Sequence, residues 1–218
     1  MILKNFENKT IIRNIEQTSW KQKICSIFLA IIMGSIFGIL AKLVDNTTIN
    51  PIFDDIGGRL GIWVFIATLL AVYASSPSVA AIRVFAFFLS MLFVYYTYTI
   101  YFLHFFPKHQ IIFWSLCALI TPICAYIMWF ARCRSLFSDF CAAIPIAVIS
   151  SESYLSCKSD LLLQGIYLCW VIVLMVLLPR NRKHYICVCI ISLMLFWLLI
   201  QTRLLSSLFG GWNTKLYV

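Results

Sequence analysis

Long stretches of hydrophobic residues alternate along this chain with short polar connections. The run 185-YICVCIISLMLFWLLI-200 is typical, because it holds no charged residue and does not alternate between apolar and polar positions. Such continuous runs predict membrane-spanning helices, which need about 20 apolar residues, rather than strands of a membrane barrel. The chain is therefore predicted to be all-α, a polytopic transmembrane helix bundle. We place its helices at 24–44, 61–76, 82–106, 111–131, 136–155, 161–178 and 185–202.

Six or seven spans are expected, because two of these stretches are imperfect as crossings. The second is short and the fifth is interrupted by polar residues, so either could be a partial or re-entrant segment. The bundle is assigned to residues 24–204, followed by a short tail, 205–218. The preceding basic segment, 1–23, has no cleavable signal peptide and reads either as an amphipathic helix on the inner membrane surface or as a disordered tail.

Composition indicates that lipid surrounds most of the chain. Of its 218 residues, 62% are hydrophobic and 11% are charged, whereas a soluble domain carries about 25% charged residues to cover its surface. The nine cysteines lie mostly inside predicted spans and read as small apolar packing residues rather than as a disulfide framework.

The net charge of +9 follows the predicted topology. Basic runs at 132–134 and 180–183 fall on one side of the membrane, while the connection 45–60 on the other side holds three aspartates, Asp45, Asp54 and Asp55. Lysine and arginine concentrate in cytoplasmic loops, so the N-terminus is predicted to be cytoplasmic. The expected partner of the basic residues is the lipid bilayer with its anionic headgroups, and no nucleic acid.

Glu152 is the clearest candidate for a ligand-binding residue, because an ionisable side chain inside a membrane is costly. It lies in 149-ISSESY-154, among serines and after Pro145. One interpretation is a carboxylate that faces a cavity and binds a ligand or a proton. The other is a residue at the outer headgroups.

A polar stripe along the third span supplies the remaining candidates. Its members recur at helical same-face spacing and are Arg83, Ser90, Thr97, Tyr101 and His104. Such a stripe is expected to face the bundle interior, because lipid would leave its hydroxyls without hydrogen bonds. It would line either a cavity for a small organic ligand or a set of interhelical hydrogen bonds.

Three further features are read as structural. Gly34 and Gly38 form a small-residue face that allows another helix to approach closely. Lys42 and Asp45 share a helix face and are interpreted either as a pair near the outer end or, together with Asp54 and Asp55, as an extracellular mouth. Asp139 follows one turn after Arg132 and Arg134, so a salt bridge at the inner surface is expected there.

No motif for catalysis, a cofactor or a metal is present in the sequence. There is no phosphate-cradling glycine loop, no HExxH, no GxSxG and no cluster of histidines and carboxylates at metal-ligand spacing. We therefore predict no catalytic residue, cofactor or metal. An enzyme acting on a lipid-like substrate would have to use Glu152 as acid/base and His104 or Arg83 to hold an anionic group.

Three segments resemble a family of small bacterial multi-spanning membrane proteins with no assigned function: 37-FGILAKLVD-45, 61-GIWVFIATLLAVYASSP-77 and 80-AAIRVFAFFLSMLFVYYTYT-99. The Ser-Glu of 149-ISSESY-154 fits the same resemblance, which implies a bacterial cytoplasmic (inner) membrane and no particular activity. The size, the short loops and the polar third span are also similar to the substrate-binding S components of energy-coupling-factor transporters. That likeness implies about six helices with a ligand pocket near the outer face.

Besides the enzyme acting on a lipid-like substrate, two functions remain open at this point. The chain binds or transports a small solute through a polar cavity in the bundle, in which case the missing ATPase motif means that a partner or an ion gradient drives uptake. Alternatively, it is a non-catalytic membrane partner, such as an assembly, immunity or regulatory subunit, which contacts another membrane protein through the Gly34 and Gly38 face.

Overall fold

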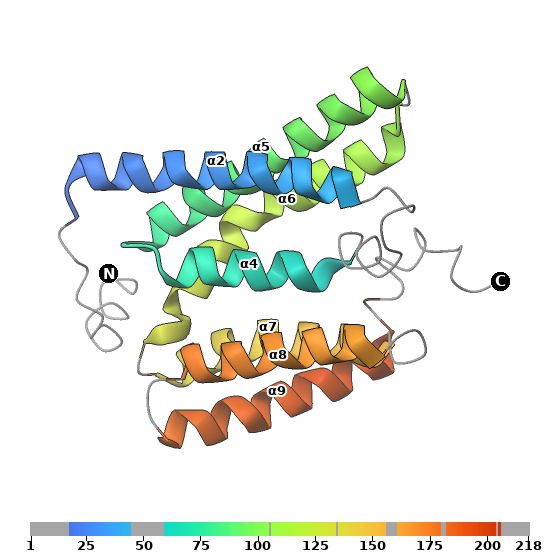
Figure 1. Cartoon of the computed structure of the whole chain (residues 1–218). Coiled ribbons are helices and arrows are strands. Elements are labelled where there is room, and N and C mark those ends of the chain that lie inside the picture. The colour runs from blue at the N-terminus through green and yellow to red at the C-terminus, as the bar shows by residue number, and fades with distance from the viewer. Residues whose placement is uncertain are drawn as a thin grey trace. The chain divides into compact units, whose positions relative to one another are not determined.

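The structure, a computed structural model, is all-helical wherever it describes the chain. The described residues are 18–44, 59–104, 106–133, 135–155, 161–179, 182–203 and 205. They form seven α-helices and one short 3-10 helix (Figure 1): α2 (Trp20–Val44), α4 (Leu60–Val72), α5 (Pro77–Leu103), α6 (Lys108–Met128), η1 (Trp129–Arg132), α7 (Leu136–Leu155), α8 (Leu161–Leu177) and α9 (Arg182–Thr202).

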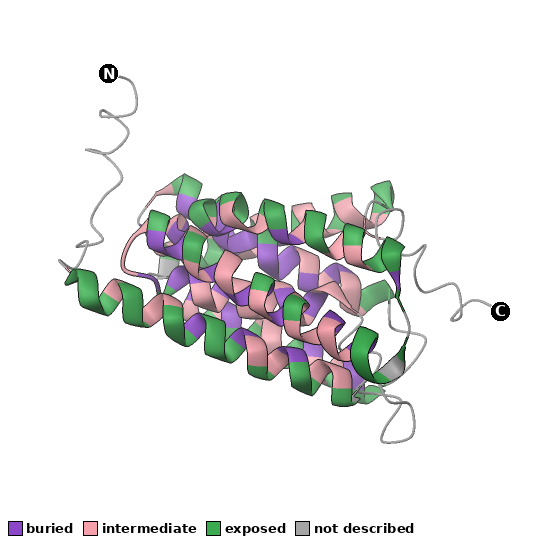
Figure 2. Ribbon diagram, turned by 90° about the horizontal axis from the view of Figure 1, so that it is seen from above, coloured by how far each residue is buried: buried purple, intermediate pink, exposed green. Residues whose placement is uncertain are grey.

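The predicted all-α membrane bundle is confirmed. Five of these helices are long and apolar enough to cross a bilayer, namely α2, α5, α6 continued by η1, α7 and α9, whereas α4 and α8 are shorter. Large apolar side chains are exposed on every described α-helix except α4, and Figure 2 shows exposed positions recurring along the helices. Apolar exposure on this scale indicates a membrane protein. The cytoplasmic N-terminus stays a prediction, and segment 1–17, the tail from 206 onward and Asp45 lie outside the described residues.

Some helices begin or end at other residues than predicted, because local capping interactions determine these ends. Helix α5 begins at Pro77 rather than 82, because the Ser76 side chain accepts a hydrogen bond from the Val79 amide and proline is favoured in a first turn. It ends at Leu103 because His104 adopts a left-handed conformation, with φ 48°.

The chain divides into two compact units. Among the described residues, one unit comprises α2, α5, α6 and α4 without Trp63–Phe65, and we call it the α2–α6 unit. The other comprises Trp63–Phe65, the end of η1, α7, α8 and α9, and we call it the α7–α9 unit. In the first, α5 packs against both α2 and α6, and in the second α7 packs against both α8 and α9.

Helix α2 lies against α5 in a constant register. A Cβ added at Gly34 would overlap the Phe87 carbonyl oxygen and the Ser90 hydroxyl, and one at Gly38 would lie 2.6 Å from the Met91 carbonyl oxygen. One turn further on, Lys42 Nζ lies 3.5 Å from the Tyr95 hydroxyl and 4.8 Å from its ring centroid. The contacts Gly34–Phe87, Gly38–Met91 and Lys42–Tyr95 each join positions 53 apart, so the two helices run parallel. The glycines allow their backbones to meet. The Gly34 and Gly38 face is thus covered by α5 and is not the surface for a second protein.

The α2–α6 unit is tied together at η1 by a buried tryptophan. Trp129 is 2% exposed and its indole nitrogen donates to the Ala74 carbonyl over 2.9 Å. We expect Trp129→Phe to lower the free energy of unfolding by about 1–3 kcal/mol, because it removes this donor and leaves a smaller ring in the same space. The comparison is Trp197→Phe, at a position that is 66% exposed, which should change the value by less than about 0.5 kcal/mol. Denaturant titration in detergent measures both, and equal values for the two variants would contradict the role of Trp129.

Candidate functional site

Asp139 is the one fully buried acidic or basic side chain in the described part of the chain. It is 3% exposed and lies in the first turn of α7, the helix that packs between α8 and α9. Hydrogen bonds of two serines stabilise the turn that precedes it. The Ser138 amide donates to the Ser135 hydroxyl over 3.2 Å, and the Ser138 hydroxyl lies 2.9 Å from the Ala131 carbonyl and 2.7 Å from the Cys133 carbonyl.

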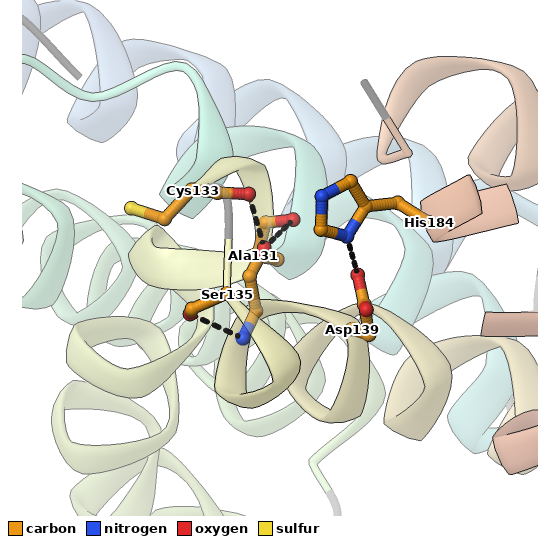
Figure 3. Close-up of polar contacts among 6 residues, drawn as sticks. Ala131, Cys133, Ser135, Asp139 and His184 are labelled. Atoms are coloured by element: carbon orange, nitrogen blue, oxygen red, sulfur yellow. Dashed lines mark hydrogen bonds and ion pairs between the residues drawn. The ribbon is translucent and has the colours of Figure 1, made fainter. Parts of the chain in front are cut away.

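The partner of Asp139 is His184, in the first turn of α9. His184 Nδ1 lies 2.7 Å from Asp139 Oδ1, and the imidazole points at the carboxylate from the neighbouring helix (Figure 3). When the Asp139 carboxylate is ionised it only accepts hydrogen bonds, and Nδ1 is then the donor. The His184 side chain is 23% exposed, and its second nitrogen, Nε2, is then left as an acceptor.

The second carboxylate oxygen, Asp139 Oδ2, is buried and has no hydrogen-bond partner among the described residues. A buried acceptor without a partner costs about 1–3 kcal/mol, and more when it is charged. The amide groups at the start of α7 offset part of this cost, since a helix N-terminus favours negative charge. What remains is a strong acceptor that a proton or a hydrogen-bond donor would satisfy.

The predicted salt bridge of Asp139 at the inner surface is wrong. The carboxylate is buried and bonded to His184, 45 positions away, instead of to Arg132, and Arg134 lies outside the described residues. Spacing along one segment could not show this pair, because it arises only when α7 and α9 pack side by side. The predicted topology did contain a signal, because spans five and seven cross in the same direction and the basic runs that precede them, 132–134 and 180–183, were assigned to one side of the membrane.

Glu152 lies near the other end of α7, with its side chain partly buried. Asp139 and Glu152 are the two acidic residues that the structure describes. At 1.5 Å of rise per residue, they are separated by about 20 Å along the helix. They therefore mark two different places in the α7–α9 unit, and a ligand-binding role for Glu152 stays a prediction.

The polar stripe of α5 does not face the interior along its whole length. Arg83, Ser90 and Thr97 are partly buried, and the Ser90 hydroxyl donates back to the Phe87 carbonyl over 2.9 Å. In contrast, Tyr101 is 74% exposed and His104 is exposed beyond the helix end. The expectation of an interior stripe is thus wrong for these two residues.

The register of α2 on α5 explains why the polar stripe is exposed at the C-terminal end of α5. A constant offset of 53 places the last residue of α2, Val44, level with Thr97. The final turns of α5, including Tyr101, extend past the end of α2. Helical spacing alone placed all five residues on one face of α5. It could not show that α2, which covers this face, ends before α5 does.

Comparison with protein-family models, with curated proteins and with solved structures gives no match for this chain. The two resemblances noted in the sequence therefore stay predictions. Within the described residues, no three histidine, cysteine, aspartate or glutamate side chains gather as metal ligands. The chemistry to be explained is the buried Asp139–His184 pair.

Proposed function

We propose that this chain is an integral membrane protein that binds and moves a small solute, and that the Asp139–His184 pair links solute binding to a proton. The observation that supports this is a 3% exposed carboxylate, bonded to an imidazole, at one end of a unit of three helices. Acidic residues and histidines inside membrane bundles are costly, and they commonly serve ion pathways and proton relays.

The pair has the chemistry for this task. Asp139 Oδ2 accepts a proton or a hydrogen bond from an amine or hydroxyl of the solute. His184 Nε2 accepts a second hydrogen bond, or donates one when the imidazole is protonated. Because the chain carries no phosphate-cradling loop for ATP, a proton gradient is a suitable source of energy for uptake.

The experiment compares the two described carboxylates. Purified wild-type protein in detergent is incubated with a bacterial metabolite extract, separated from free molecules by gel filtration and denatured, and the retained molecules are identified by mass spectrometry. We expect a small molecule that wild type and Glu152→Gln retain and that Asp139→Asn loses. Calorimetry of that molecule in two buffers of different ionisation enthalpy should then show net proton uptake or release on binding.

Two outcomes would redirect the proposal. If Glu152→Gln loses the molecule and Asp139→Asn keeps it, the solute binds at the other end of α7. If wild type retains nothing, the solute function fails, and the non-catalytic partner protein becomes the better proposal, with the Asp139–His184 pair as a structural link between α7 and α9.

A further inference from the structure

Arg83 is a cation in an apolar helix, and it has no hydrogen-bond or ion-pair partner among the described residues. It lies six positions after the first residue of α5, inside the candidate span Pro77–Phe102. Its side chain is partly buried, and its Nε atom is buried without a hydrogen-bond partner among the described residues. Neither described carboxylate pairs with it. An ionisable side chain inside an apolar span is costly unless an anion lies close to it.

The side chain of Arg83 leaves α5 on its packed side. Ala80 and Phe87, three positions before and four after it, are 0% and 1% exposed, whereas the adjacent Ile82 is 52% exposed. Residues three and four apart share a helix face. Arg83 thus emerges beside a neighbouring helix instead of on the face that is exposed to lipid chains.

The register identifies the part of α2 that lies beside it. Extending the offset of 53 by one turn from Gly34 and Phe87 places Ala30, which is 2% exposed, level with Arg83. An alanine leaves room for a guanidinium group. One turn nearer the N-terminus of α2 lies Ser26, followed by Lys23, and both side chains are partly exposed.

Side chains in a helix lean toward its N-terminus, so the Arg83 guanidinium reaches back toward the start of α5. We infer that the seam between the N-terminal halves of α2 and α5 binds a phosphate group, with Arg83 as its main ligand and Ser26 and Lys23 at its rim. The source that fits best is the headgroup of an anionic phospholipid, because the predicted topology places this end at the inner leaflet.

The test measures thermal unfolding of delipidated full-length protein in a neutral detergent, with added phosphatidylglycerol, phosphatidylcholine or inorganic phosphate. We expect phosphatidylglycerol at about 100-fold above its Kd to raise the Tm by about 5–10 °C, and phosphatidylcholine to raise it much less. If inorganic phosphate raises the Tm as much as phosphatidylglycerol, the anion site stands and its natural ligand is a soluble phosphate. Equal responses to the two lipids, with none to phosphate, would overturn the inference.

Variants locate the response. Arg83→Gln should abolish the rise caused by phosphatidylglycerol, and Arg83→Lys should keep part of it, because lysine also binds phosphate. Lys108→Gln, which removes an exposed cation at the start of α6, should keep the full rise. An undiminished rise in Tm in Arg83→Gln contradicts a phosphate site at Arg83.

If Arg83→Gln does not fold, the responses of wild type to the two lipids and to phosphate, together with the response of Arg83→Lys, still test the site. Asp139→Asn should keep the lipid response, so this inference and the proposed solute function fail separately.

Discussion

Replacing Gly34 by leucine should prevent α2 from packing against α5 and should leave little folded protein. Even a single added carbon overlaps the Phe87 carbonyl oxygen, which belongs to the backbone of α5 and cannot rotate away, and the Ser90 hydroxyl. We expect Gly34→Ala to lower the free energy of unfolding by about 1–3 kcal/mol, the usual cost of overpacking, and Gly34→Leu to exceed it. Association of helices in lipid depends on close van der Waals packing, so a lost contact is not recovered by burying apolar surface elsewhere.

Gly165 provides the matched control for this prediction. It also lies inside a helix, α8, but an added Cβ there meets nothing within 4 Å. Alanine restricts the unfolded chain more than glycine does, so Gly165→Ala should raise the free energy of unfolding by about 0.5–1 kcal/mol. Denaturant titration in one detergent measures both variants. A Gly34→Ala protein as stable as Gly165→Ala would show that α2 and α5 do not meet at these glycines.

Much of the fold follows directly from the hydrophobic pattern. Every predicted stretch corresponds to a helix, and the fifth, 136–155, has the same bounds as α7, because a helix in lipid must satisfy its own backbone and an apolar run has no alternative. The ends were less predictable, since they depend on local hydrogen bonds such as the Ser76 cap of α5. A hydropathy pattern contains no information on such bonds.

The candidate site was less predictable than the fold, for a different reason. Glu152 stood out because it interrupts an apolar stretch, whereas Asp139 was hidden among the basic residues that mark a loop. Its burial depends on which helices are neighbours, and the pairing of α7 with α9 is a tertiary fact. The α5 stripe shows the same limit, because exposure of Tyr101 is decided by the length of α2.

Removing His184 should destabilise the protein more than removing Asp139. In His184→Leu, the buried carboxylate loses its hydrogen bond and has no other described partner in its unit. A buried acceptor left without its partner costs about 1–3 kcal/mol, and more when it is charged. In Asp139→Leu, the remaining imidazole is 23% exposed and can bond to water instead, so the loss should be smaller, about 0.5–1.5 kcal/mol. Unfolding of the two variants at one pH in the same detergent gives the comparison. A larger loss for Asp139→Leu would mean that the carboxylate is already neutral in the folded protein.

The double variant Asp139→Leu/His184→Leu separates structure from function. Replacing both members of a buried pair by apolar residues of similar size is often neutral or stabilising, so the double variant should be more stable than His184→Leu, and the double-mutant cycle should be strongly non-additive. If the pair only joins α7 to α9, leucine packing replaces it and any retained solute is still bound. If the pair is the working group of a solute carrier, the double variant is well folded and yet retains no solute. A double variant that regains stability but does not bind the solute would exclude a purely structural role. If the pair only joined α7 to α9, solute binding would return together with the packing of the two helices.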